Sequence, residues 1–137
     1  VGMPYETREL IFDSVKLIRE IGSFDSLSVN IFVPYHGTPL REAATKEGWL
    51  DPHRQNTSVI SESILEMPRP YLSAPEILSL QRVLPLYVSM PEDRYPEILR
   101  AEQFDDEGNA IFEKLAAEFF RLKYGEDEDD RMLTFAG

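Results

Sequence analysis

Two short loops of this chain carry residue types that bind small molecules through the main chain. The first loop, residues 1–7, reads Val-Gly-Met-Pro-Tyr-Glu-Thr and opens a helical pattern. Gly2 lets a ligand approach the backbone closely, and Pro4 stiffens the turn. The N–H groups at the start of the following helix can receive an anion or the polar edge of a ligand. Glu6 suits a ribose hydroxyl or an amine, although such a glutamate more often complements a helix dipole.

The second loop, residues 34–39, reads Pro-Tyr-His-Gly-Thr-Pro and follows a segment of alternating apolar residues. Gly37 allows a positive φ, and Thr38 can cap the next helix. Tyr35 and His36 are placed to face a site at the end of the preceding strand. Each loop, taken alone, fits a plain connection between a strand and a helix at least as well as it fits a site.

The residues for metal or nucleophilic chemistry are largely missing from the sequence. No cysteine is present, so thiolate zinc sites and cysteine-ligated iron–sulfur clusters cannot form within these residues. The two histidines, His36 and His53, do not have metal-ligand spacing. No nucleophile elbow, phosphate-binding loop or dinucleotide fingerprint occurs. We therefore assign no catalytic residue and no metal ligand.

The composition indicates a folded, acidic protein. Hydrophobic residues make up 42% of the chain, and 25 acidic against 14 basic residues give a net charge of -11. Because binding to phosphates needs Lys and Arg, this balance argues against a nucleic-acid partner. No apolar run reaches the roughly 18 residues that cross a membrane, and no signal peptide is visible. We expect a cytoplasmic protein with an acidic, solvated tail over residues 126–137.

Hydrophobic periodicity predicts a parallel α/β fold. Apolar residues at helical spacing predict a helix over residues 8–21 that ends at Gly22. Residues 27–33 alternate between apolar and polar side chains, which predicts a strand, and residues 39–47 predict a second helix. Two consecutive parallel strands would bring both loops to the same edge of the sheet. The loops are therefore expected to lie close together.

The remainder of the chain is predicted to be mainly helical. Residues 51–74 read as an irregular crossing segment with a short strand over residues 60–67. Helices are predicted over residues 75–89, with a kink at Pro85, and over residues 107–124. The chain is thus divided into four parts: residues 1–50, 51–74, 75–125 and 126–137.

The two loops resemble two segments of the radical S-adenosylmethionine enzymes. Residues 1–12, VGMPYETRELIF, resemble the family segment "GLPGET-x-E-x-I/F". Residues 27–40, LSVNIFVPYHGTPL, resemble the later segment "S-x-x-I-F-x-P-Y-P-G-T-x-L". Their order and spacing match the subgroup that often carries a cobalamin-binding domain, and residues 48–50 are similar to its continuation. Tyr5 stands where many members have glycine, and His36 where many have proline.

This resemblance implies the last strand–helix units of a partial (β/α)6 TIM-like barrel, followed by a helical extension. Members of the family hold a four-iron four-sulfur (4Fe-4S) cluster on a Cys-x3-Cys-x2-Cys loop, and the cluster reductively cleaves S-adenosylmethionine to a 5′-deoxyadenosyl radical. Because that loop is missing from these residues, the resemblance implies a C-terminal portion of a longer oxidoreductase. The cofactors of the full-length protein would be S-adenosylmethionine and the cluster, with cobalamin in the members that bind it.

The resemblance also implies which residues approach the cofactor, mainly through the main chain. They are Gly2, Met3, Pro4, Glu6, Tyr35, Gly37 and Thr38. The substrate stays unknown. The alternative interpretation is a small free-standing α/β binding or protein-interaction module without catalysis. In the C-terminal portion implied by the resemblance, the missing strands would leave open sheet edges that favour self-association.

We predict that the isolated chain binds no iron–sulfur cluster and has no catalytic activity of its own, because no thiolate is available to hold iron. Anaerobic incubation with iron and sulfide, followed by desalting, should leave iron at the background level. Stoichiometric iron on the desalted chain would contradict this expectation.

Overall fold

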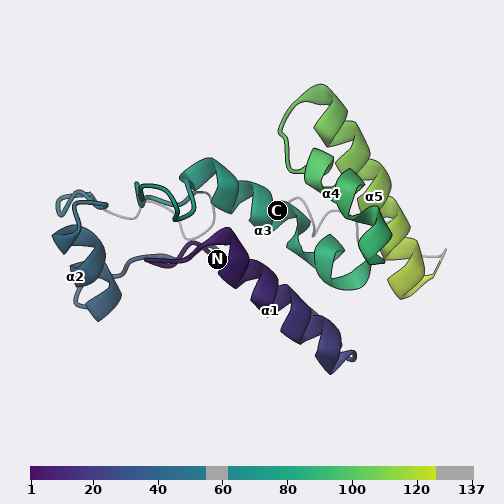
Figure 1. Cartoon of the computed structure of the whole chain (residues 1–137), viewed down its shortest axis with the longest axis horizontal. Coiled ribbons are helices and arrows are strands. Elements are labelled where there is room, and N and C mark those ends of the chain that lie inside the picture. The colour runs from purple at the N-terminus through teal and green to yellow at the C-terminus, as the bar shows by residue number, and fades with distance from the viewer. Residues whose placement is uncertain (55–61, 126–137) are drawn as a thin grey trace. The chain divides into compact units, whose positions relative to one another are not determined.

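The computed structural model describes residues 1–54 and 62–125. In that part of the chain the structure is built from helices joined by long irregular segments (Figure 1). The helices are α1 (Arg8–Ile21), α2 (Pro39–Lys46), α3 (Ala74–Ser89), α4 (Tyr95–Ala101) and α5 (Asp106–Tyr124), with a 3₁₀ turn, η1 (Glu92–Arg94), ahead of α4.

The predicted α/β fold is wrong, because the described residues form no sheet and therefore no part of a TIM-like barrel. Segment 27–33 is extended, with Ile31 buried and Asn30 exposed. Its only backbone partner of the strand type is Val1, whose amino group donates to the Asn30 carbonyl (2.7 Å) and whose carbonyl accepts from the Phe32 N–H (2.8 Å) in the described chain. These two bonds follow the parallel pattern, but a single facing residue makes no strand.

The short strand predicted over residues 60–67 is not seen either. Residues 62–67 are irregular, and residues 60 and 61 lie outside the described part of the chain. Alternating apolar residues predict an extended, half-buried segment. A β-strand also needs a second strand that forms hydrogen bonds with it over several residues. Self-association through open sheet edges is not tested by this structure and stays a prediction.

The chain forms two compact units, each built from segments that are far apart in the sequence. The first unit contains Val1–Ser14 and Ser28–Gln81, and the second contains Val15–Leu27 and Arg82–Gly137. Two of the three boundaries fall within α1 and α3, and the third lies between Leu27 and Ser28, whereas the sequence pattern divided the chain after residues 50, 74 and 125. The predicted acidic tail, residues 126–137, lies outside the described residues.

The predicted helix ends are confirmed in the first half of the chain. The Thr7 hydroxyl accepts from the Leu10 N–H (3.3 Å) at the start of α1. Gly22 ends that helix at φ +74, where a side chain would be strained. The Thr38 hydroxyl accepts from the Arg41 N–H (3.4 Å) and caps α2. The local chemistry of caps is thus sufficient to place these boundaries.

The core of the first unit gathers around the N-terminal half of α3. Ile77 and Leu80 of this helix are fully buried, together with Leu65 and Leu72 of the irregular segment before it. Gly2 packs directly against Ile77: a Cβ atom at Gly2 would lie 3.0 Å from the Ile77 side chain, and its φ is +87. Glycine is therefore needed at this position for both conformation and space.

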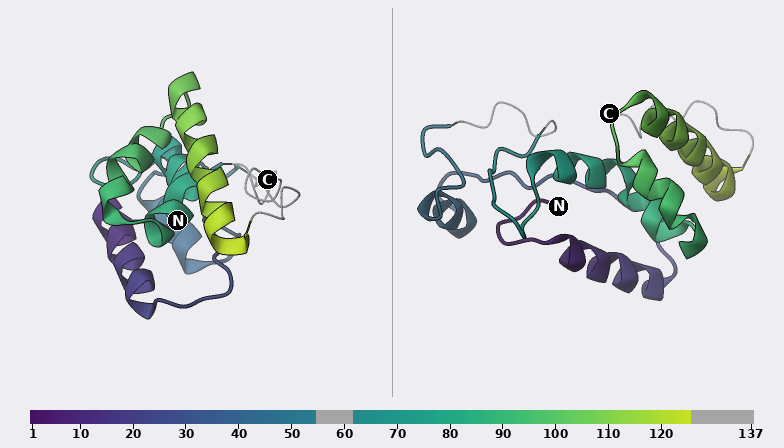
Figure 2. Two further views of the ribbon diagram at one scale, coloured as in Figure 1. Left: turned by 90° about the vertical axis from the view of Figure 1, so that its right-hand side faces the viewer. Right: turned by 45° about the horizontal axis from the view of Figure 1, so that its top comes forward.

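The core of the second unit is formed by the C-terminal half of α3 with α4 and α5. Residues 83–88 of α3 are buried on all sides, as expected for a helix segment without a polar face. Helices α4 and α5 lie side by side (Figures 1 and 2). Arg94 joins them by donating to the carboxylates of Glu97 (2.8 Å) and Glu118 (2.7 Å). The hydrogen bonds from Arg94 to Glu118 hold the pKa of the Glu118 carboxyl below its usual value.

We predict that Leu115→Ala lowers the free energy of unfolding by about 2–5 kcal/mol, because Leu115 is fully buried in α5 and its removal leaves a cavity. Leu122→Ala on the same helix is the matched control, since Leu122 is 75% exposed. It should change the unfolding free energy by less than about 0.5 kcal/mol. Urea unfolding measures both values, and equal losses in the two variants would contradict this core.

Candidate functional site

The two loops identified in the sequence lie in the same unit. Val1 is hydrogen-bonded to residues 30–32 in the parallel sense. The residues that follow Val1 and those that follow Phe32 therefore leave the pair in the same direction. The rest of the first loop, from Gly2 to Thr7, and the second loop, residues 34–39, thus follow at the same end of the pair. Figure 1 shows the purple N-terminal segment running beside the blue segment that leads to α2.

Hydrogen bonds of Glu6 stabilise the conformation of the first loop. The Glu6 carboxylate accepts from the Gly2 N–H (2.6 Å), and the Glu6 main chain donates to the Met3 carbonyl (3.1 Å) and accepts from the Leu72 N–H (3.1 Å). The Gly2 N–H thus has a partner within the loop, and Glu6 fixes the shape of the loop. Met3 is 46% exposed, while Pro4 is buried. Any ligand at this loop would meet Met3 before it meets the main chain of Gly2.

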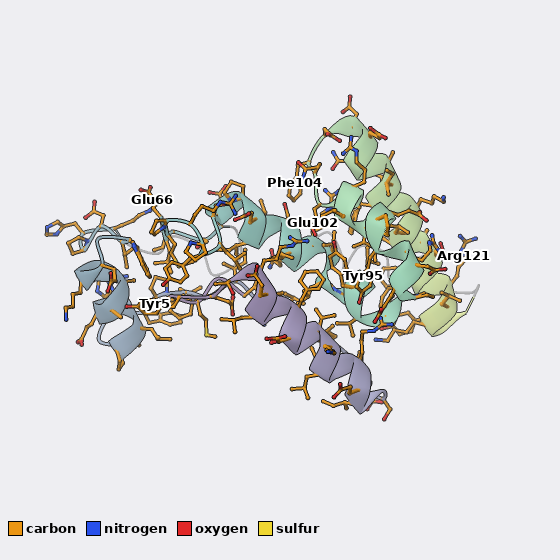
Figure 3. All side chains as sticks on the ribbon, viewed as in Figure 1. Tyr5, Glu66, Tyr95, Glu102, Phe104 and Arg121 are labelled. Atoms are coloured by element: carbon orange, nitrogen blue, oxygen red, sulfur yellow. The ribbon has the colours of Figure 1, made fainter. Side chains whose placement is uncertain are left out.

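Tyr5 joins the first loop to the end of α2. Its φ of +66 is unusual for a residue with a side chain. The ring lies 5.0 Å from that of Trp49 and 5.7 Å from that of Tyr71, both edge-on, and the hydroxyl donates to the Glu47 carboxylate (3.2 Å). Figure 3 labels Tyr5 beside α2. The sequence analysis singled out Tyr5 but not its contacts with Trp49 and Tyr71.

The second loop is held by Arg41, a buried residue that the sequence reasoning did not single out. Its guanidinium donates from Nη1 to the Pro34 carbonyl (2.7 Å) and from Nη2 to the carbonyls of Arg54 (3.0 Å) and Pro52 (3.4 Å). Arg41 thereby ties both sides of α2 together. The Thr38 hydroxyl adds a bond to the Tyr35 carbonyl (2.7 Å).

The remaining predicted residues of the second loop are accessible. Tyr35 is 56% exposed, His36 is exposed, and a Cβ atom at Gly37 would meet nothing within 4 Å. A cavity of about 440 Å³ opens beside this loop and is lined by His36, Gly37 and residues of α2. The second loop therefore has free space around it, which the first loop lacks at Gly2.

The two histidines, His36 and His53, lie on either side of α2 in the sequence. The main-chain N–H of His53 donates to the Asp51 carboxylate (2.9 Å) within its own turn. In the part of the chain that the structure describes, no group of three potential metal-ligating side chains is found. The contacts of the predicted cofactor with Gly2, Met3, Pro4, Glu6, Tyr35, Gly37 and Thr38 stay a prediction.

Several buried polar groups of the second unit pair with one another, whereas the buried Nε of Arg82 has no hydrogen-bond partner among the described residues. The Tyr87 hydroxyl donates to the Glu102 carboxylate (2.6 Å). The Arg82 guanidinium donates to Asn109 (2.7 Å) and stacks over Phe104 at 4.5 Å, and burial lowers its pKa. Figure 3 shows Glu102 and Phe104 in this unit. These contacts stabilise the packing of the helices in this unit.

No protein-family model matches the chain, and no curated protein or solved structure is significantly similar to it. Among the described helices, none is both long enough and apolar enough to span a bilayer.

We predict that the Tyr5 phenol titrates above the ordinary tyrosine pKa of 10.0, because partial burial and the hydrogen bond to Glu47 both favour the neutral form. The tyrosinate difference spectrum of the chain against Tyr5→Phe isolates this group. The stability that Tyr5 contributes should be complete below pH 10.0 and decline as the pH rises through the folded pKa.

Glu47→Gln should bring the titration of Tyr5 part of the way back, because burial, the larger cause, stays in place. A Tyr5 titration at or below the ordinary pKa in the parent chain would show that this contact does not form.

Proposed function

We propose that these residues form the S-adenosylmethionine-facing part of a radical S-adenosylmethionine enzyme. The iron–sulfur cluster would be held by cysteines elsewhere in the full-length protein. The proposal rests on one observation. Val1 is hydrogen-bonded to residues 30–32 in the parallel sense, so the first and second loops leave this pair in the same direction within one unit. The proposal does not include a barrel, because the described residues form no sheet.

The two loops would have different roles in this function. The first loop has a preset shape, because Glu6 accepts from the Gly2 N–H and Ile77 packs against Gly2. The second loop offers an open main chain at Gly37 and an exposed side chain at Tyr35. Adenosine would therefore lie against the open second loop and the exposed edge of the first, near Met3.

Further parts of the expectation belong to the same proposal. The full-length protein would use S-adenosylmethionine and the cluster, with cobalamin if it belongs to the cobalamin-binding members. It would act in the cytoplasm on a substrate that is not identified. The excess of 25 acidic over 14 basic residues argues against a nucleic-acid partner, because binding to phosphates needs Lys and Arg.

The test uses the protein encoded by the entire reading frame that contains these residues, loaded with its cluster under anaerobic conditions. Gly37→Val should weaken S-adenosylmethionine binding by about tenfold or more, which corresponds to about 1.4 kcal/mol. Gly48→Val is the matched control. Gly48 has a φ of +77 against +79 at Gly37, and a Cβ atom at either position meets nothing within 4 Å.

Equal effects of the two substitutions on S-adenosylmethionine binding would contradict the proposal, since only backbone strain would then be measured. A reading frame without a Cys-x3-Cys-x2-Cys segment would also contradict it. Gly2→Val is a poor probe, because its side chain would collide with Ile77 and disturb the loop itself.

A further inference from the structure

The cavity beside the second loop concentrates positive charge in an otherwise acidic chain. Its lining includes two cations, Arg41 and Lys46, against one carboxylate, Glu42. The chain as a whole carries a net charge of -11. A local excess of cations around an open cavity is the electrostatic condition for holding an anion.

Of the cations that line the cavity, Arg41 contributes most to the attraction for an anion, because its charge is buried and fixed in place. Arg41 is 5% exposed, and its guanidinium bonds to three main-chain carbonyls. Within the described residues, no carboxylate lies at ion-pair distance from it. Carbonyl dipoles satisfy the N–H groups but bring no negative charge, so the buried cation keeps its long-range attraction for an anion.

The surroundings leave room for such a ligand. The cavity volume of about 440 Å³ lies in the range of small-molecule pockets and exceeds what a single inorganic ion fills. Gly37 lies at the edge of the cavity, where a Cβ atom would meet nothing within 4 Å. Lys46 is an exposed residue of α2, so its side chain can reorient toward a ligand. The lining therefore supplies one fixed cation and one adjustable cation.

We propose that this cavity binds the phosphate group of a small phosphate monoester. Phosphate carries between one and two negative charges at neutral pH, which the fixed charge of Arg41 attracts, and it accepts several hydrogen bonds, which the Lys46 ammonium can donate. The inference stands apart from the S-adenosylmethionine proposal. Because both share Gly37, binding of the phosphate compound is measured on the isolated chain without S-adenosylmethionine.

The experiment is calorimetric titration of the chain with glycerol 3-phosphate, inorganic phosphate and glycerol. Glycerol 3-phosphate should bind saturably and more tightly than inorganic phosphate, and glycerol should not bind. Tighter binding of inorganic phosphate would overturn the assignment to an ester. Absence of saturable binding by either phosphate compound would overturn the site.

Charge variants locate the binding. Lys46→Gln should weaken glycerol 3-phosphate binding by roughly 2–5-fold, and Glu42→Gln should strengthen it by a similar factor, the range of a partly exposed charge pair. A folding defect cannot produce the gain at Glu42. Lys16→Gln, which removes the same charge from an exposed position of α1, should leave the affinity unchanged. Equal losses in Lys16→Gln and Lys46→Gln would overturn the site in favour of non-specific attraction.

Discussion

Donation from buried or half-buried arginines to main-chain carbonyls is the interaction on which the rest of this structure depends. Long irregular segments join the helices, and their carbonyl groups have no ladder of strand hydrogen bonds to satisfy them. A planar guanidinium presents five N–H donors in a fixed fork, so one side chain can hold several carbonyls at once. Arg41 does this for irregular chain in the first unit, whereas in the second unit Arg19 and Arg82 hold carbonyls at or next to the ends of helices α3, α4 and α5. The carbonyls they hold are those of Pro34, Pro52 and Arg54 for Arg41, those of Tyr87, Val88 and Met90 for Arg19, and those of Ala101 and Gly108 for Arg82.

This constraint explains which features could be predicted from the sequence. Caps and helix periodicity are local, so Thr7, Gly22 and Thr38 were placed correctly, and α5 begins one residue before its predicted start. The strand over residues 27–33 was predicted from alternation, which reports burial but not a neighbouring strand. The role of Arg41 was missed because its acceptors lie 7 to 13 residues away in irregular chain, where no periodic pattern marks them. The Tyr5 cluster was missed for the same reason, since Trp49 and Tyr71 meet Tyr5 only through the fold.

The candidate site follows from the same arrangement. Glu6 and Ile77 fix the first loop around Gly2, so the glycine serves the packing of the protein itself. Arg41 fixes the second loop but leaves Gly37 open and leaves its own charge without a carboxylate. A preset loop next to an open one is a suitable frame for a ligand, because little ordering remains to be done on binding. The proposed adenosine contact and the proposed phosphate site both draw on this open second loop.

The central claim, that Arg41 holds the second loop through the geometry of its fork, is tested most directly by hydrogen exchange in Arg41→Lys. The substitution keeps the charge but replaces the planar fork by a single ammonium. The amides of Thr38 and Arg54, which bond to the carbonyls of Tyr35 (3.3 Å) and Asp51 (3.0 Å), should exchange about tenfold faster or more, equivalent to about 1.4 kcal/mol of local opening. The amides of α5 should keep their rates and serve as the internal reference. Unchanged exchange at Thr38 and Arg54 would contradict the account.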